Sequence, residues 1–326
     1  MLVMNQKFSD FIAKYKNTKM AVAVSGGVDS MCLLYWLHDI GADIVCLHVN
    51  HKLRAEADIE TEYVADTCKK LNIPCKIFYW DGEKPEKGLE AAAREARYKM
   101  MADYCHENNI EYLVTAHQSD DQIETFLMNL SRGSGLYGLA AMLPESTRNG
   151  LKILRPLLNV SREEIKKYCE DNNIKYFVDS MNSDEHYTRV KIRKNRHILN
   201  DELGISDARI LLAIQNLSRT REWMDKYIES RVEMVIRSWG ALFISSFLFD
   251  EAEEIRLKFL GTLIQKIGGD IYPVRLNSLQ MALSKLGADC KFTLGHCTIR
   301  RLNDRILIVP EGKRTSFRKR HEKRHI

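Results

Sequence analysis

The stretch MAVAVSGGVDSMCLLYWLHDIG, residues 20–41, passes from a short apolar run through two glycines into a longer apolar segment. Residues 20–24 are typical of a buried strand, and the following pattern predicts a helix over about 29–39, ended by Gly41. Gly26 and Gly27 allow a ligand to approach the backbone closely, and the first N–H groups of the helix suit an anion. The stretch therefore predicts either a plain turn or a phosphate-binding loop.

Asp29 bears on how a phosphate would be held there. A carboxylate repels a phosphate unless a cation lies between them, and Mg²⁺ resolves that conflict. Ser25 and Ser30 add hydroxyl donors. The alternative is that Asp29 caps the helix after a glycine turn, and the loop alone does not decide between the two. The loop is not a Walker A motif, because no Gly-Lys followed by Ser or Thr occurs.

The rest of the first 200 residues alternates between strand-like and helix-like segments. Four further apolar or β-branched runs predict strands, at 43–50, 75–80, 112–117 and 151–158. Segments with helical spacing separate them, at 56–71, 88–108 and about 120–130, and a capping box at Ser161 and Glu164 begins another helix. This alternation predicts an α/β fold with an open, mainly parallel sheet and helices on both faces. The segments SGGVDS, HVNH and TAHQSDD all follow strands, so we expect them at one ligand-binding edge.

The pattern changes after about residue 200. Residues 207–239 and 251–267 are predicted to be helical, and the segment from Lys291 to Pro310 alternates like strands with a hairpin turn at Asn303-Asp304. We therefore expect a catalytic domain over 1–205, a helical linker over 206–240 and a small α+β domain over 241–326. A length of 326 residues favours more than one domain.

Composition narrows the class of protein. Charged residues make up 29% and apolar residues 45%, which is typical of a globular chain, and no apolar run is long enough to span a bilayer. No secretory signal is recognised, so a cytoplasmic location is expected. Eight cysteines without a C-x-x-C pair favour buried reduced thiols over zinc or disulfides. The net charge is +5, and basic residues cluster at 189–196 and in the C-terminal tail. Such clusters suit RNA phosphates, and a solvated helix face and a disordered tail are the common alternatives.

Several segments together indicate a family. After a strand, SGGVDS resembles the pyrophosphate loop of N-type ATP pyrophosphatases, the PP-loop superfamily. The ordered set of segments resembles tRNA(Ile)-lysidine synthetases, densely over residues 18–200 and more weakly over 292–308. The segments that carry this resemblance are LHVNHKLR (47–54), GLEAAAREARY (88–98), TAHQSDDQIETFLMNLSRGSGLYGLAAM (115–142), ILRPLL (153–158) and DSMNSDEHYTRVKIR (179–193).

The resemblance implies a ligase that uses ATP and Mg²⁺. In that family, ATP adenylates the C2 oxygen of the wobble cytidine in the CAU anticodon of a minor isoleucine tRNA. The ε-amino group of lysine then displaces AMP, which gives lysidine, AMP and pyrophosphate. The expected partners are therefore this tRNA and L-lysine. No association with a membrane is expected. A homodimer is one candidate assembly, and the sequence does not decide the oligomeric state.

The predicted site residues fall into four groups. The ATP phosphates are assigned to the loop residues Ser25, Gly26, Gly27, Val28, Asp29 and Ser30, with Mg²⁺ on Asp29 and Asp121. Catalytic roles are assigned to Asp29, His117, Asp120, Asp121 and Arg132, and either a carboxylate or His117 acts as general base. Substrate contacts are assigned to His48, His51, Arg94, Arg97 and Glu124. RNA phosphate contacts are assigned to Arg189, Lys191, Arg193, Lys194 and Arg196.

Each group has a plainer interpretation. The acidic residues from Asp120 to Glu124 also fit the ordinary preference for acids at a helix N-terminus. Arg94 and Arg97 also fit surface ion pairs with Glu90 and Glu95. The two histidines also fit a solvated loop, and Arg132 also fits a helix end at Gly133.

Two positions depart from the family. Its members commonly show Ser or Thr and then Asn-x-Asp where this chain has Met181-Asn182-Ser183-Asp184, and Arg-Asn where it has Arg189-Val190. Roles of the missing polar side chains are therefore not carried over. Two other functions stay open: tRNA thiolation by a related enzyme, which normally uses cysteine pairs or an iron–sulfur cluster, and RNA binding without catalysis.

Overall fold

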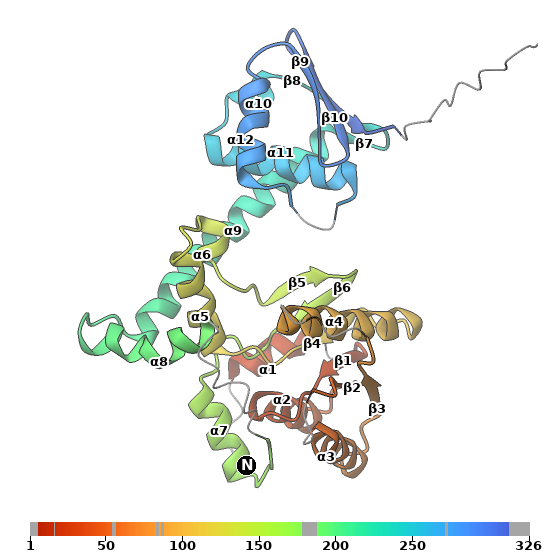
Figure 1. Cartoon of the computed structure of the whole chain (residues 1–326), viewed down its shortest axis with the longest axis vertical. Coiled ribbons are helices and arrows are strands. Elements are labelled where there is room, and N and C mark those ends of the chain that lie inside the picture. Colours follow the sequence, from red (N-terminus) through yellow and green to blue (C-terminus); the bar gives the residue numbers. More distant parts are fainter. Residues whose placement is uncertain are drawn as a thin grey trace, which may run out of the picture. The chain divides into compact units, whose positions relative to one another are not determined.

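Two units make up the chain, Met1–Arg219 and Thr220–Ile326 (Figure 1). The structure is a computed structural model that describes residues 6–15, 17–53, 57–82, 85, 88–177, 188–270 and 273–312. Met181 and the basic tail beyond Gly312 lie outside these ranges.

The first unit is built on a six-stranded sheet in the order β3-β2-β1-β4-β6-β5. Every pairing is parallel except that of β5 with β6, so the predicted mainly parallel sheet is confirmed. The order reverses between β1 and β4, which places a ligand crevice at their carboxyl ends. The strands are β1 (Met20–Ala23), β2 (Ile44–Asn50), β3 (Cys75–Tyr79), β4 (Tyr112–Val114), β5 (Glu145–Arg148) and β6 (Leu151–Leu154).

Helices cover both faces of this sheet, as predicted. The alternate strand residues Met20 and Val22 pack in one core with α1, α2, α3 and α7, whereas Ala21 packs in a second core with α4. Successive residues of β1 therefore contact helices on opposite faces of the sheet. The helices of this unit are α1 (Gln6–Ala13), α2 (Val28–Asp39), α3 (Ala57–Lys70), α4 (Leu89–Glu107), α5 (Ser119–Leu130), α6 (Leu136–Leu139), α7 (Arg162–Asp171) and α8 (Thr188–Asp201).

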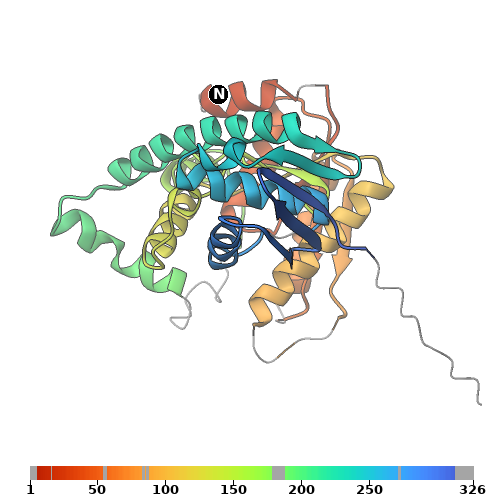
Figure 2. The same cartoon turned by 90° about the horizontal axis from the view of Figure 1, so that it is seen from above.

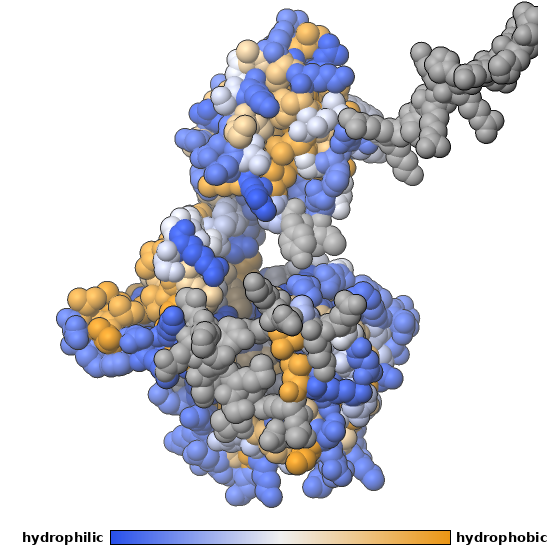
Figure 3. All heavy atoms as spheres, viewed as in Figure 1, coloured by the Kyte–Doolittle hydropathy of each residue, from blue (hydrophilic) through white to orange (hydrophobic). Residues whose placement is uncertain are grey.

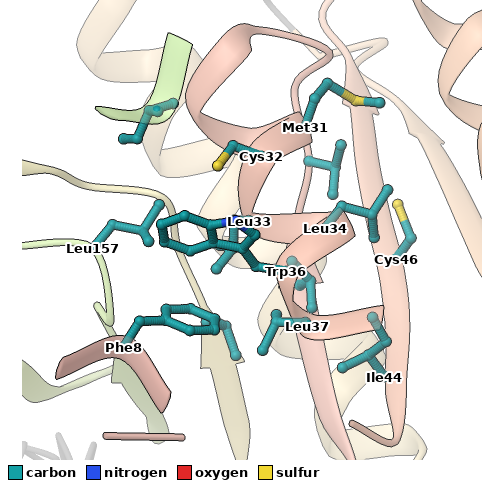
Figure 4. Close-up of a cluster of buried hydrophobic side chains, with 14 of the residues drawn as sticks. Phe8, Met31, Cys32, Leu33, Leu34, Trp36, Leu37, Ile44, Cys46 and Leu157 are labelled. Carbon is teal, nitrogen blue, oxygen red and sulfur yellow. The ribbon is translucent and has the colours of Figure 1, made fainter. Parts of the chain in front are cut away.

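Trp36 fixes the position of α2 in the larger core (Figure 4). Its ring centroid lies 4.9 Å from that of Phe8 on α1 and 5.2 Å from that of Tyr168 on α7. Leu33 and Leu37 on the same helix are fully buried. Because α2 begins directly after the glycine loop, this packing also holds the loop in place.

The predicted strands differ from the structure at several places. The strand predicted over 112–117 ends at Val114. The strand predicted over 151–158 ends at Leu154, because Pro156 has no N–H group to donate to a neighbouring strand. Strand β5 was not predicted, since Glu145–Arg148 is polar and short. It pairs with β6 through a two-residue turn at Asn149-Gly150, and both turn residues have positive φ, 51° and 78°.

The second unit combines helices with an antiparallel sheet, as the predicted α+β fold requires. Its strands are β7 (Ile236–Arg237), β8 (Gly240–Ile244), β9 (Cys290–Leu294), β10 (Cys297–Leu302) and β11 (Arg305–Pro310), in the order β7-β8-β11-β10-β9. The hairpin at Asn303-Asp304 joins β10 to β11 as predicted. The helices that belong wholly to this unit are α10 (Ser246–Phe249), α11 (Glu253–Gly268) and α12 (Leu276–Lys285).

Helix α9 (Asp207–Val235) runs through the boundary between the two units, and Figure 2 shows it as one long unbroken helix. It begins where the helix predicted over 207–239 begins, but it ends at Val235, because Ile236 and Arg237 form strand β7 and pair with β8. Its role as a linker stays a prediction. In the described ranges, none of the helices is long and apolar enough to cross a membrane. Most of the surface in Figure 3 is hydrophilic, with exposed apolar residues such as Leu203 and Ile205 at the corner between α8 and α9.

Candidate active site

The glycine loop between β1 and α2 is held by its own serines. The Ser30 hydroxyl donates to the Gly27 carbonyl oxygen at 2.9 Å and accepts from the Ser25 N–H at 3.2 Å. Gly26 has a φ of +89°, a backbone conformation that residues other than glycine rarely adopt. Gly27 is the N-cap of α2 and supplies no side-chain cap, so the positive end of the helix faces the loop with uncapped N–H groups.

A cavity of about 600 Å³ opens beside this loop. It lies at the carboxyl ends of β1, β2 and β4, the edge that the fold reserves for a ligand. Its volume falls within the usual range for small-molecule sites. The predicted residues that line it are Ser25, Gly27, Val28, Asp29, Ser30, His48, His51, Arg94, Arg97 and His117.

Asp29 does not cap the helix. Its Oδ1 is buried and has no hydrogen-bond partner among the described residues. Burial raises the pKa of its carboxyl to about 6, and the nearby carboxylates of Asp121 and Asp120 raise it further against the opposing effect of Arg162. An unpaired carboxylate in this position is poised for a cation.

Asp121 takes part in the start of α5, and both Asp120 and Asp121 bring negative charge close to Asp29. One Asp121 oxygen accepts the Gln118 N–H at 3.1 Å, which completes a capping box at the start of α5. Burial also raises the pKa of Asp121, so its charge is poorly solvated. Asp120 contacts Arg196 at 3.3 Å. The helix-capping role is therefore observed for Asp121, and the catalytic roles of both residues stay predictions.

These carboxylates pass a test of fit for Mg²⁺. The hard cation prefers carboxylate oxygens, and Asp29 offers a buried oxygen without a partner. Asp121 is close enough to affect the charge of Asp29. Burial is the main cause of both raised pKa values, and a divalent cation would offset the cost of keeping these carboxylates ionised there.

His117 follows β4 and faces an electropositive environment. Burial lowers the pKa of its imidazole to about 3, and Arg155, Arg94 and Arg97 lower it further. Its Nδ1 lies 2.9 Å from the Thr115 hydroxyl. His117 is therefore neutral over the whole physiological pH range.

Arg94 and Arg97 face the cavity from α4. Their guanidinium groups lie 5.3 Å and 5.6 Å from the ring centroid of Tyr98. Glu95, one partner considered for them, pairs with Arg148 instead, and the side chain of Glu90 lies outside the described part of the structure. Burial lowers the pKa of Arg97, as do the nearby cations Arg94 and Arg148. Two cations on one wall of the cavity, one of them poorly solvated, favour an anionic ligand.

The two predicted histidines form part of the cavity wall. His48 is buried, and its ring nitrogens lie 2.8 Å from the Val24 carbonyl oxygen and 3.0 Å from the Thr61 hydroxyl. It therefore supports the β1–β2–α3 wall rather than a solvated loop. His51 packs edge-on against Trp80 with ring centroids 5.8 Å apart.

Glu124 anchors the basic helix α8. Its carboxylate is fully buried, and it accepts a hydrogen bond from Arg193 Nε at 2.8 Å. Arg189 Nε lies 3.4 Å from its other oxygen. Arg196 reaches Asp207 at 3.1 Å in addition to Asp120. Three of the five predicted RNA-binding side chains thus pair with acidic residues, and Lys191 and Lys194 are exposed.

Other predicted positions lie away from the cavity. Arg132 is exposed beyond the C-terminal end of α5, about 18 Å of helix from the residues that begin it. It is not among the side chains that line the cavity, so its contact with phosphate stays a prediction. Val190 is buried, and an apolar side chain suits that place on α8.

Sequence reasoning missed three charged residues of the cavity: Glu60 on α3, and Arg162 and Lys166 on α7. Arg162 is near enough to Asp29 to favour its ionised form. The capping box at Ser161 predicted where α7 begins, and the spacing of Arg162 and Lys166 by four placed both on one face. Nothing in that pattern showed which face would meet the cavity.

Comparisons with known proteins place this site in a family. Residues 1–200 match the PP-loop domain. The chain is 35% identical over 312 residues to the tRNA(Ile)-lysidine synthase of Wolbachia pipientis wMel, covering 92% of this chain and 72% of that protein. It is 34% identical over 326 residues to the enzyme of that name from Wolbachia sp. subsp. Brugia malayi (strain TRS), covering 95% and 74%.

A solved structure supports the fold. The U34-tRNA thiolase NcsA from Methanococcus maripaludis, solved with its 4Fe-4S cluster, superimposes with a TM-score of 0.55 at 19% identity. The match covers 66% of this chain and 77% of that one, and at this identity it supports the fold alone. The sequence matches go further: the chain has a PP-loop domain and belongs to the tRNA(Ile)-lysidine synthase family.

Proposed function

We propose that the chain ligates L-lysine to C2 of the wobble cytidine of a CAU-anticodon isoleucine tRNA, at the expense of ATP. Membership of the lysidine synthase family supports the reaction. One observation in the structure carries the proposal: the Asp29 oxygen without a hydrogen-bond partner lies beside the glycine loop. The same cavity is lined by the positive charges of Arg94 and Arg97. That combination suits a polyphosphate and its metal ion.

In the first step, the C2 oxygen of cytidine attacks the α-phosphorus of ATP, and the bond from that phosphorus to pyrophosphate breaks. The loop from Ser25 to Ser30 binds the phosphates through backbone N–H groups and hydroxyls. Asp29 and Asp121 would hold Mg²⁺, which neutralises phosphate charge when bound. Arg94 and Arg97 stabilise the negative charge that develops in the transition state.

In the second step, the lysine ε-amine attacks C2 and the bond from C2 to the AMP oxygen breaks. The ammonium group must first lose a proton. His117 is a weak base, because its pKa is lowered to about 3. We therefore assign proton removal to a nearby carboxylate that does not hold Mg²⁺. His117 would instead form a hydrogen bond to the substrate.

The tRNA would lie across more than one element. Lys191 and Lys194 on α8 offer exposed positive charge, and Arg189, Arg193 and Arg196 add to it while they hold α8 on α5. The second unit would bind the body of the tRNA, with the basic tail adding further contacts. These contacts position the RNA without reading its sequence.

An Asp29→Ala variant tests the assignment of the loop. Lysine transfer to tRNA should fall below detection, because the phosphate and metal site loses its central carboxylate, whereas tRNA affinity should change less than twofold. An Asp43→Asn variant on the surface near β2 is the matched control and should transfer lysine normally. Loss of tRNA binding in Asp29→Ala would instead assign that residue a structural role.

A further inference from the structure

Three cysteines meet in the first unit although their sequence spacing matches no metal motif. The sulfur atoms of Cys46, Cys68 and Cys75 all lie within 4.8 Å of one another. They come from three different elements, β2, α3 and β3. The site lies outside the candidate active site, since none of the three lines its cavity.

The fold explains why these sulfurs converge. Cys46 and Cys75 are register partners on neighbouring parallel strands, so their side chains leave the same face of the sheet. Helix α3 covers that face and brings Cys68 over the pair from its last turn. Cys46 and Cys68 are fully buried in the larger apolar core, where Figure 4 shows Cys46 beside the α2 layer. Cys75, on the edge strand of the sheet, is exposed.

The chemistry of the cluster suits a soft metal ion. Contacts with the thiols of Cys46 and Cys68 lower the pKa of Cys75. The same arrangement raises the pKa of Cys46 and of Cys68. Thiolates are the ligands that soft cations prefer, and Zn–S bonds of about 2.3 Å in a tetrahedral site separate the sulfurs by about 3.8 Å. Only a small contraction of the cluster is needed to reach that spacing.

We propose that Cys46, Cys68 and Cys75 bind one Zn²⁺ through three thiolates, with a water molecule at the fourth position on the exposed side of Cys75. Zinc binding forms three Zn–S bonds and releases the protons of Cys46 and Cys68 to solvent. A disulfide would use only two of the three sulfurs, whereas a thiophilic cation accounts for all three. His48 is not the fourth ligand, because its two ring nitrogens already contact Val24 and Thr61.

The site would tie together the two elements that support one wall of the active site. Strand β2 carries Cys46 and, two residues on, His48 of the cavity wall. Helix α3 carries Cys68 and also Glu60 of the same wall. The proposed ion is therefore structural, and its binding does not depend on the ligase reaction.

Titration of the full, reduced chain with Cd²⁺ and with Zn²⁺ tests the proposal. We expect one Cd²⁺ per chain with the ultraviolet charge-transfer band of cadmium thiolates, and Zn²⁺ should displace it. Bound Zn²⁺ should also protect the exposed Cys75 from alkylation in peptide mass mapping of the folded chain. Metal bound only at the carboxylates of the active site would give no thiolate band and would overturn the proposal.

Cys75→Ser is the informative variant, because an exposed position tolerates serine without loss of folding. It should weaken Zn²⁺ affinity at least tenfold and leave the unfolding temperature of the metal-free chain unchanged. Cys290→Ser is the matched control, since Cys290 also lies on an edge strand, β9, and it should bind Zn²⁺ like the unchanged chain. Equal affinity in the two variants contradicts the proposal. So does a chain that binds no Zn²⁺ when reduced and forms a disulfide within the trio on oxidation.

Discussion

Asp29 shows a conflict between stability and function. Its carboxylate is held next to Asp120 and Asp121 with an oxygen that no described group satisfies. Such a group destabilises the folded chain when it is ionised and no cation is bound. Functional sites commonly hold charges in this way.

An Asp29→Asn variant should therefore be more stable than the unchanged chain at pH 7.5 without Mg²⁺. The folded-state pKa of about 6 lies above the ordinary value of 3.8. The ionised carboxylate thus costs stability that builds up as the pH rises from about 4 through 6. The difference between these two pKa values corresponds to ~3 kcal/mol in the free energy of unfolding.

Urea unfolding in EDTA at pH 4 and at pH 7.5 measures this effect. The free energy of unfolding of Asp29→Asn should exceed that of the unchanged chain at pH 7.5 and nearly equal it at pH 4. Asp43→Asn should match the unchanged chain at both pH values. A variant that is less stable than the unchanged chain at pH 7.5 would contradict this electrostatic account.

His117 should remain neutral between pH 5 and 8, since its pKa is lowered to about 3 by burial and by the surrounding arginines. Nitrogen chemical shifts of the imidazole, assigned by loss of the signal in His117→Asn, report its protonation directly. A titration of this ring within that range would restore His117 as the general base.

The sequence predicted the phosphate loop, and the reasons are partly local. Gly26, Gly27 and Asp29 stand between a strand and a helix, and this local context made a phosphate loop one of two interpretations. The family resemblance of the other segments then favoured it. Arg162 was missed because its role depends on how α7 packs against α2, which no local pattern encodes.

At the scale of elements, α8 is held on α5 by a buried carboxylate with two arginines. Glu124 is fully buried, and Arg193 and Arg189 are its partners. A basic sequence alone predicted an RNA-binding surface, and it did not show that three of these side chains also fix the helix. The partners on α5 lie about 70 residues earlier, so the pairing is a tertiary feature.

Glu124→Gln should destabilise the first unit by about 2 kcal/mol, because two arginines lose their charged partner. The arginines are partly exposed, which keeps the loss below that of a fully buried pair. Thermal unfolding measures it, with the exposed Glu163→Gln on α7 as control. Equal stability of the two variants would show that the pairing contributes little.

Lys191→Ala should weaken tRNA binding with no change in stability, because this side chain is exposed on α8. Loss of one phosphate contact lowers the slope of log affinity against log salt concentration by about 0.7–0.9. Filter binding at several salt concentrations gives that slope. An unchanged slope would place the RNA on a different face.

The hairpin of β5 and β6 shows where the prediction of elements was incomplete. Asn149-Gly150 is a strong turn signal, yet the polar segment Glu145–Arg148 has no apolar alternation to mark it as a strand. Its pairing with β6 depends on a neighbour already placed in the sheet.

For the whole molecule, the family indicates the reaction, and the cavity in the first unit is the place that we propose for it. The chain covers 72–74% of the two relatives named above, and its first unit contains the loop, the carboxylates and the arginines. The ordered segments in the sequence were enough to identify this family. The meeting of Cys46, Cys68 and Cys75 was not predictable, because it depends on the register of β2 with β3 and on the packing of α3 over that pair.

Transfer of labelled lysine tests the central claim most directly. The full chain is incubated with ATP, Mg²⁺, labelled L-lysine and, in separate reactions, unmodified CAU-anticodon isoleucine tRNA or methionine tRNA. Label should enter the isoleucine tRNA, depend on ATP, and release one AMP and one pyrophosphate for each lysine transferred, while the methionine tRNA stays unlabelled. A folded chain that binds the isoleucine tRNA and transfers no lysine to it would contradict the proposed function.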